Sequence, residues 1–322
     1  MALMADIFNK TLVLADGTVL DCFDPDLLNL KDGSGCGTGA GGFKPGNTCA
    51  RGGAGVEEVD LHPALKKLKV PQDRINEMED HVKYVVGKIL SNGADKVDDA
   101  LIAEHTQYLN EKLKGIVAKA KPHIRVSDDA MSQILDDGRF KNQFEVARSG
   151  GAYNPRLRAK VENVDMGVDP ETPHPERPIY GYLTEDALNF GTSSLESYGA
   201  VVIELHSEVK DRSTITLQDS LQRAVATPAN NPSLLSMAED AFGTPPQLKR
   251  DTVDIWPYTE MQVHGGLSLK DIKKVNLQSP GPRRPIIDDR NAWRQAEWDK
   301  FDQQREVLIK KLEAAGIAWE LY

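Results

Sequence analysis

The stretch Trp256-Pro-Tyr-Thr-Glu-Met-Gln-Val-His-Gly-Gly-Leu267 has the alternating pattern of a β-strand that ends in a turn. One side of this strand carries hydrogen-bonding groups, namely Tyr258, Glu260, Gln262 and His264. The other side carries Thr259, Met261 and Val263, which suit a core. Successive side chains on one face lie about 7 Å apart, so a carboxylate, an amide and an imidazole form a row. The pattern favours a ligand site, and an ordinary solvated strand face is the alternative.

Length and composition describe a soluble globular protein. The chain has 322 residues, of which 40% are hydrophobic and 27% are charged, enough for one large domain with appendages or for two domains. The formal charge of −10 argues against direct nucleic-acid binding, which needs a basic face. The sequence has no run of apolar residues that could cross a membrane and no secretory signal, so we expect a cytoplasmic location.

Residues 1–58 are expected to form an N-terminal arm. Asp16-Gly17 between two short apolar runs predicts a hairpin, and a glycine-rich run from Gly33 to Gly55 follows it. This run lacks the Gly-Lys-Ser/Thr ending of a phosphate-binding loop, so a flexible arm or docking peptide is favoured. The three cysteines, Cys22, Cys36 and Cys49, form an evenly spaced series with His62. A structural zinc site usually has two ligands only two to four residues apart, so the cysteines are interpreted as free thiols. No metal is therefore expected.

Residues 59–125 are expected to be helical. Apolar residues recur at three-to-four spacing over 75–89 and again over 97–119, which predicts a helical hairpin that buries its stripe against the next domain. A short helix over 128–136 should begin after Ser127, with carboxylates in its first turn.

Residues 126–285 have the short, turn-separated runs of an antiparallel α+β domain. The predicted strands cover 140–146, 179–183, 200–206, 213–217 and 258–263, and the intervening segments 219–226 and 233–241 are predicted to be helical. A C-terminal region, 286–322, contains a helix over about 289–315 with an apolar stripe. This stripe is read as docking onto the chain's own domain or as an oligomer contact.

Five motifs follow one another in the domain: Gly138-Arg-Phe-Lys-Asn-Gln-Phe-Glu145, Ser149-Gly-Gly-Ala152, Glu176-Arg-Pro-Ile-Tyr-Gly-Tyr-Leu183, Asp211-Arg-Ser-Thr-Ile-Thr-Leu-Gln-Asp-Ser220 and Tyr258 to Gly265. Together they resemble a bacterial and phage family of uncharacterised proteins that is grouped with the ADP-ribosyltransferase superfamily of the Arg–Ser–Glu type. The resemblance covers roughly residues 130–275. The segment 43–50 also resembles one in tailed-phage head-associated proteins, which points to a virion.

The resemblance implies two split antiparallel sheets that bind NAD, as a substrate, in the cleft between them. Arg177 matches the arginine that holds a cofactor phosphate, and a guanidinium fork suits phosphate oxygens. Ser213 and Thr214 match the strand that orders the nicotinamide end, where Thr216 replaces a serine. For each of these residues a purely structural role is the alternative: a surface arginine before Pro178, or hydroxyls with strand propensity.

The same resemblance makes Glu260 the carboxylate that stabilises an oxocarbenium-like transition state, with Gln262 on the same face and His264 positioning the substrate. Active relatives usually place the catalytic glutamate second in a Glu/Gln-x-Glu pair, whereas this chain has Glu260-Met-Gln262. Two readings follow: Glu260 acts from a shifted position, or the site binds a nucleotide without transferring it. Asp219-Ser220 and Ser268 with Asp271 are interpreted as helix caps.

Two functions of different class are therefore expected. The first is a phage-encoded ADP-ribosyltransferase that transfers ADP-ribose from NAD to a host protein or other host macromolecule, in the host cytoplasm. The second is a virion protein, minor head or capsid-associated, with an inactive transferase-like domain that contacts phage capsid or neck proteins.

Overall fold

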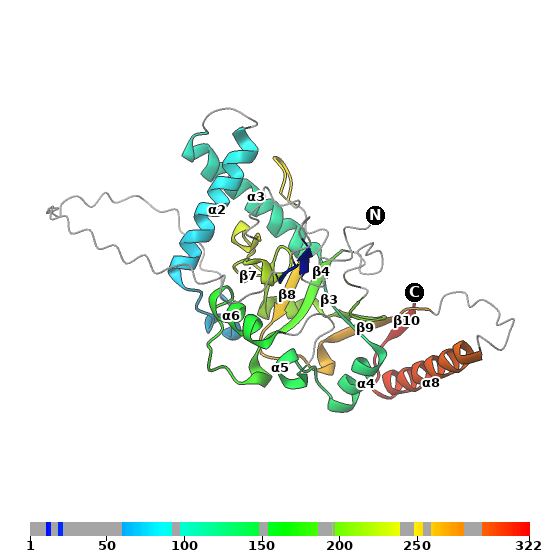
Figure 1. Ribbon diagram of the computed structural model, residues 1–322. Helices are drawn as coiled ribbons and strands as arrows, with labels where there is room; N and C mark the ends of the chain where they lie inside the picture. The colour runs from blue at the N-terminus through cyan, green and yellow to red at the C-terminus, as the bar shows by residue number, and fades with distance from the viewer. Residues whose placement is uncertain are drawn as a thin grey trace. The chain divides into compact units, whose positions relative to one another are not determined.

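The computed structural model describes residues 60–91, 97–147, 154–185, 195, 197–238, 248–253, 259–279 and 292–322, together with two short strands near the N-terminus (Figure 1). The chain divides into two units, Met1–Glu57 and Glu58–Tyr322. In the described part of the chain, no helix has both the length and the apolar character needed to cross a lipid bilayer.

The first unit contains a small hairpin. β1 (Thr11–Val13) pairs antiparallel with β2 (Val19–Asp21), and Leu12 lies opposite Leu20. This confirms the strand pair expected on either side of Asp16-Gly17. The glycine-rich run and the three cysteines lie outside the described residues.

Eight strands of the second unit form one sheet in the order β10-β9-β5-β3-β4-β8-β6-β7. They are β3 (Lys121–Val126), β4 (Ile179–Thr184), β5 (Val201–Leu205), β6 (Ser213–Thr216), β7 (Thr227–Pro228), β8 (Glu260–Val263), β9 (Ile272–Leu277) and β10 (Trp319–Leu321). Neighbouring strands are antiparallel except β9 and β10.

The expected mixed α+β class with a largely antiparallel sheet is confirmed, but the split into two sheets is wrong for the described residues. The reason is that β8 bonds to β4 along one edge and to β6 along the other, which joins the strands into a continuous sheet. The close approach of β3 and β4 depends on Gly181, where a Cβ would lie 2.4 Å from the carbonyl oxygen of His123.

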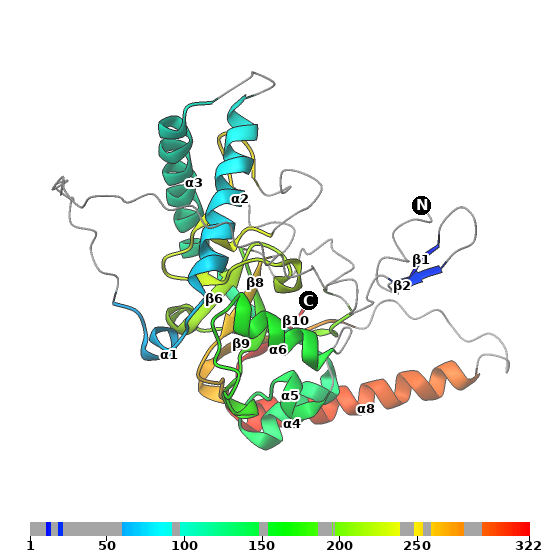
Figure 2. The same ribbon diagram turned by 60° about the vertical axis from the view of Figure 1, so that its left-hand side comes forward.

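The helices of this unit are α1 (Pro63–Lys66), α2 (Gln72–Ser91), α3 (Asp99–Lys119), α4 (Asp128–Asp137), α5 (Gln143–Val146), α6 (Pro155–Val164) and α8 (Ala292–Ala314). Figures 1 and 2 show α2 and α3 side by side as the expected hairpin. Asp98 caps α3 and Ser127 caps α4, each accepting a hydrogen bond from a backbone N–H of the first turn. Both helices therefore begin where the sequence places a capping side chain.

The C-terminal helix docks onto the chain's own second unit. α8 lies beside α4 (Figures 1 and 2), and Leu308 and Leu312 are 1% and 0% exposed within the main core. Arg305 forms an ion pair with Asp128 at 2.7 Å. Of the two alternatives for this stripe, the structure shows the intramolecular one for the C-terminal half of the helix.

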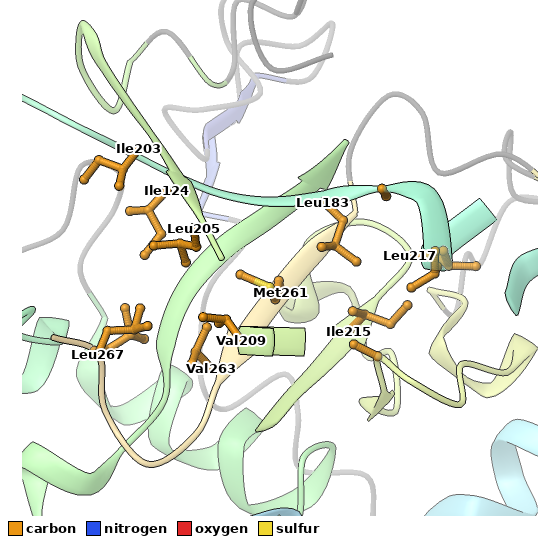
Figure 3. Close-up of a cluster of buried hydrophobic side chains, with 14 of the residues drawn as sticks. Ile124, Leu183, Ile203, Leu205, Val209, Ile215, Leu217, Met261, Val263 and Leu267 are labelled. Atoms are coloured by element: carbon orange, nitrogen blue, oxygen red, sulfur yellow. The ribbon is translucent and has the colours of Figure 1, made fainter. Parts of the chain in front are cut away.

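One hydrophobic core joins the helical hairpin, the sheet and α8. Figure 3 shows part of it, where Met261 and Val263 of β8 lie among side chains of the neighbouring strands and of the loops after them. Met261 and Val263 are both fully buried. This confirms the core side of the strand that the alternation predicts.

Three local predictions are wrong. Residues 140–146 do not form a strand, because the side chain of Asn142 caps Phe144 and Glu145 and so starts the single turn of α5. The segments 219–226 and 233–241 contain only the short 3₁₀ helices η4 (Ser220–Gln222) and η5 (Leu234–Ser236) within their described residues. η4 stops because Arg223 adopts a left-handed conformation with φ 59°.

Candidate functional site

Three adjacent strands place a set of polar side chains on one side of the sheet. In the strand register, Gln262 lies opposite Tyr180 of β4 and Thr214 of β6, while Glu260 lies opposite Tyr182 and Thr216. We call these six side chains the polar face: Tyr180, Tyr182, Thr214, Thr216, Glu260 and Gln262. All of them are buried except Tyr180, which is half-buried. The predicted alternation along β8 is thus confirmed, although its polar side is covered rather than solvated.

Gln262 holds the centre of the polar face. Its Nε2 donates to Thr216 Oγ1 at 3.1 Å and to Glu260 Oε1 at 2.9 Å. Its Oε1 accepts from Thr214 Oγ1 at 2.9 Å, and that hydroxyl also lies 2.9 Å from His264 Nε2. The amide therefore fixes the rotamers of its neighbours on β6 and β8.

Glu260 is the ionisable residue of the polar face. Its Oε1 accepts hydrogen bonds from Ser220 Oγ at 2.5 Å and from Gln262 Nε2, while Arg158 Nη1 lies 3.8 Å away. Burial raises the pKa of Glu260 to about 7, because desolvation outweighs the attraction of Arg158. The nearby Asp219 carboxylate acts in the same direction as burial. Near neutral pH this carboxyl group can therefore either give or take a proton.

Arg158 approaches from α6, which covers this part of the polar face. Its guanidinium lies 4.3 Å from the centre of the Tyr180 ring, and Nη1 donates to Ser220 Oγ at 2.6 Å. Burial alone would lower the pKa of Arg158, but Tyr180, Glu260, Asp219 and Glu162 nearby keep it raised. The guanidinium therefore stays charged beside the buried acid.

Arg177, which the resemblance assigns to a phosphate, is bound by a carboxylate of α6. Glu162, which is fully buried, accepts Arg177 Nη1 at 2.7 Å and the Tyr180 hydroxyl at 2.7 Å. Arg177 Nη2 donates to the carbonyl oxygen of Pro170, and its guanidinium lies 4.7 Å from the ring centre of Phe144. Arg177 thus belongs to the same network as Glu260, through Tyr180 and Arg158, but its charge is balanced by Glu162.

His264 directly follows β8 and is the last of the alternating polar residues Glu260, Gln262 and His264. Burial lowers its pKa to about 4, so the imidazole is neutral at physiological pH and shares its Nε2 with Thr214. The structure therefore brings four of the predicted site residues together on one side of the sheet: Glu260, Gln262, Thr214 and His264.

Ser213 is a correction. Because it neighbours Thr214 along β6, its side chain points to the opposite side of the sheet, where Oγ donates to the carbonyl oxygen of Val209 at 2.7 Å. Ser213 is fully buried there and does not belong to the polar face. The hydroxyl of Ser213 is thus one residue from Thr214 in the sequence but on the other face of β6, away from Glu260.

Sequence reasoning missed four members of the network: Arg158, Glu162, Tyr180 and Ser220. The signal for α6 is present, since Asn154-Pro155 is an N-cap followed by proline at the first helical position, but this helix was not predicted. Ser220 does follow the predicted cap Asp219, which accepts from Leu221 N at 2.9 Å. Its own hydroxyl nevertheless serves Glu260.

Other residues of the resemblance have structural roles. Arg139 and Glu145 form an ion pair at 2.6 Å, and Glu145 closes the capping box of α5. Ser268 and Asp271 form the expected capping box. Tyr258 and the segment 149–152 lie outside the described residues.

The described residues contain no cluster of three or more His, Cys, Asp or Glu side chains that could hold a metal ion. Two surface hollows, of about 300 Å³ beside α4 and α8 and about 170 Å³ beside the end of α3, are lined by residues outside the polar face. The polar face itself is closed by its own hydrogen bonds.

Comparison with known proteins points to bacteriophages. The chain is 28% identical over 205 residues to the Gene 2 protein of Mycobacterium phage L5, across 58% of this chain and 68% of that protein. It is 26% identical over 231 residues to the Gene 2 protein of Mycobacterium phage D29, across 67% and 77% of the two chains. No family model matches the chain. These similarities support a bacteriophage origin and name no activity.

Proposed function

We propose that this protein is a phage-encoded ADP-ribosyltransferase that uses NAD as a substrate and modifies a host macromolecule. The observation that carries the proposal is Glu260, a buried carboxyl group with a pKa of about 7 and with an arginine, a serine and an amide around it. A strongly shifted pKa together with a specific charged partner is a feature of functional sites, because a catalytic group needs a pKa matched to its task.

The composition of the polar face supports the same proposal. Burying hydroxyl, amide and carboxyl groups costs free energy that an apolar face would not, even when each finds a hydrogen-bond partner. The opposite side of the same strands is mainly apolar: Met261, Val263 and Ile215 are fully buried there, beside the hydroxyl of Ser213. One face of β8 therefore serves the core, and the other carries chemistry that packing alone does not require.

The reaction fits the groups on the polar face. Transfer breaks the bond between the nicotinamide nitrogen and the ribose carbon, and the electron pair leaves with nicotinamide. A nucleophile of the acceptor then bonds to that carbon and loses a proton. Ionised Glu260 favours the positive charge that develops on the ribose, and its pKa near 7 also suits it to take the proton. Gln262 supplies no charge, but it orients Glu260 through a 2.9 Å hydrogen bond.

A second candidate, a virion structural protein with an inactive transferase-like domain, is favoured by a different observation. Each of Glu260, Gln262, Thr214 and Thr216 is hydrogen-bonded within the protein. A closed network of this kind rigidifies the fold and needs no ligand. In this case the partners are phage capsid or neck proteins, and the protein is found in the particle.

The test is transfer of labelled ADP-ribose from NAD to proteins of a host extract. We expect labelling by the wild-type chain and a loss of roughly 100-fold or more in Glu260→Gln, which removes the titratable carboxyl group but keeps the shape. Glu313→Gln, an exposed glutamate on α8, is the matched control and should label normally. No labelling by wild type, with the protein present in purified particles by mass spectrometry, favours the structural candidate instead.

A further inference from the structure

We propose that Arg158, rather than Arg177, binds the phosphate of the ligand whose ribose Glu260 contacts, so that the site selects a ribose phosphate. This inference rests on the proposed function, and it names the cation that completes the site. Both arginines belong to one network, so the question is which of them has its charge and its N–H groups available.

Arg177 is occupied. Its Nη1 donates to the fully buried Glu162 at 2.7 Å, in an ion pair whose two side chains are 8% and 0% exposed. Its Nη2 donates to the carbonyl oxygen of Pro170 at 2.9 Å. A phosphate that used this guanidinium would have to displace a buried carboxylate and leave it without its partner, which is costly.

Arg158 is available. A guanidinium carries five N–H donors, and among the described residues Arg158 makes one hydrogen bond, from Nη1 to Ser220. Its Nη1 stands 3.8 Å from Glu260, too far for a hydrogen bond. The side chain is 13% exposed, so it lies at the border between the buried network and the solvent.

The guanidinium carbon of Arg158 lies over the Tyr180 ring, 4.3 Å from its centre. A guanidinium that lies over an aromatic ring is held without using its N–H groups, which can then form the two parallel hydrogen bonds that a phosphate accepts. Because the fork is already held by the ring and by Ser220, little side-chain entropy is lost when an anion binds. Arg158 is therefore a preorganised anion ligand.

The neighbours of Arg158 indicate what else the ligand must carry. Glu260 lies 3.8 Å from Arg158, and Asp219 directly precedes Ser220, to which Arg158 donates a hydrogen bond. A bare anion beside two carboxylates is disfavoured, whereas a molecule with hydroxyl donors next to its phosphate satisfies both charges. Tyr198, a residue that is 39% exposed, is also in this region: burial raises the pKa of Tyr198, Asp219 and Glu260 raise it further, and Arg158 lowers it. A ribose phosphate meets these requirements.

The experiment measures the dissociation constants of ADP-ribose and NAD by calorimetry for matched arginine variants of the full chain. We expect Arg158→Gln to weaken binding roughly 10- to 100-fold, and Arg158→Lys to bind with intermediate affinity because it keeps the charge but loses the fork. Arg156→Gln, an exposed arginine on the same helix, should bind as wild type does. The pair Arg177→Met with Glu162→Gln removes the second cation together with its counter-charge; because Glu162 also bonds the Tyr180 hydroxyl, binding should weaken here, but by less than in Arg158→Gln.

The outcomes separate the two proposals. If wild type binds ADP-ribose but Arg158→Gln and Arg158→Lys bind equally well, or if only the Arg177 pair loses binding, Arg158 is not the phosphate ligand and the proposed function stands. If wild type binds neither NAD nor ADP-ribose, the proposed function fails and takes this inference with it. Unchanged thermal unfolding of each variant shows that a lost affinity reflects the site; if Arg158→Gln does not fold, Arg158→Lys decides.

Discussion

Glu260 shows how a sheet sets the chemistry of one side chain. Ser220 and Gln262 donate to the same oxygen, and Arg158 stands within 3.8 Å, all of which favour the ionised form. Burial nevertheless wins, because a carboxylate loses more hydration here than these partners return. The result is a carboxyl group that titrates near pH 7, a pH at which an ordinary glutamate is fully ionised.

This shift predicts a specific pH dependence of stability. The pKa of Glu260 rises from 4.5 unfolded to about 7 folded, so the native state binds more protons between these values and stability falls as pH rises through them. The free energy of unfolding of wild type, minus that of Glu260→Gln, should drop by on the order of 3 kcal/mol from pH 4.5 to pH 7. Chemical denaturation at a series of pH values measures it.

His264 supplies the control with the opposite sign. Its pKa falls from 6.5 to about 4, so the unfolded state binds more protons there and stability rises with pH. The difference between wild type and His264→Gln should therefore increase between pH 4 and pH 6.5. If the difference in free energy of unfolding between wild type and Glu260→Gln did not change with pH, the pKa of Glu260 would be the same in the folded and unfolded states, which contradicts the account.

At the residue scale, the sequence predicts the row Glu260, Gln262 and His264 because strand alternation is a local property. It could not show that Arg177 is neutralised by Glu162, or that Arg158 reaches Glu260. Arg158 and Glu260 lie far apart in the sequence, on α6 and β8, and Arg177 stands just before β4, outside the helix that carries Glu162. The prediction for Ser213 is wrong for a local reason: successive side chains along β6 point to opposite faces, so Ser213 and Thr214 cannot both face the site.

At the element scale, one arginine ties the helical hairpin to the candidate site. Arg74 of α2 donates to Asp165, the C-cap of α6, at 2.7 Å, and to the carbonyl oxygen of Arg223 just after η4. α6 carries Arg158 and Glu162, and η4 carries Ser220. Through this buried clamp α2 holds both elements that cover the polar face.

Removing this clamp should be costly. Arg74→Met leaves the carboxylate of Asp165, whose side chain is 6% exposed, without its main cation and should lower the free energy of unfolding by about 3–5 kcal/mol. Denaturant titration measures the loss, and Glu79→Ala, at an exposed position in the middle of the same helix, should change the free energy of unfolding by less than about 0.5 kcal/mol.

Adding Asp165→Asn to Arg74→Met removes the uncompensated charge and should restore part of that stability. A double variant as unstable as Arg74→Met alone would show that lost packing, rather than charge, explains the effect.

The elements that were predicted correctly are those with strong local signals. α2, α3 and α8 have helical periodicity, and β4, β5, β6 and β8 have apolar runs or alternation. β3 was missed although it is central, because Pro122, His123 and Arg125 do not read as a buried strand and only pairing with β4 and β5 makes it one. β10 was missed because its three residues depend on the distant β9.

At the scale of the whole molecule, the second unit combines a shared core with one chemically distinctive face. The core runs from Val82 of α2 to Leu312 of α8, so helices and sheet form one cooperative body. The similarity to two phage proteins supports a bacteriophage origin for the chain. Transfer of ADP-ribose at the polar face would distinguish the proposed enzyme from a virion component, because a structural protein needs no reaction there.

The most direct measurement is amide hydrogen exchange of the wild-type chain with and without excess NAD. NAD bound at the polar face should slow exchange in α6 (155–164), in η4 (220–222) and along 260–264, and should leave α8 (292–314) unchanged. Unchanged exchange throughout, or protection confined to α2, α3 or α8, would contradict a nucleotide site built around Glu260.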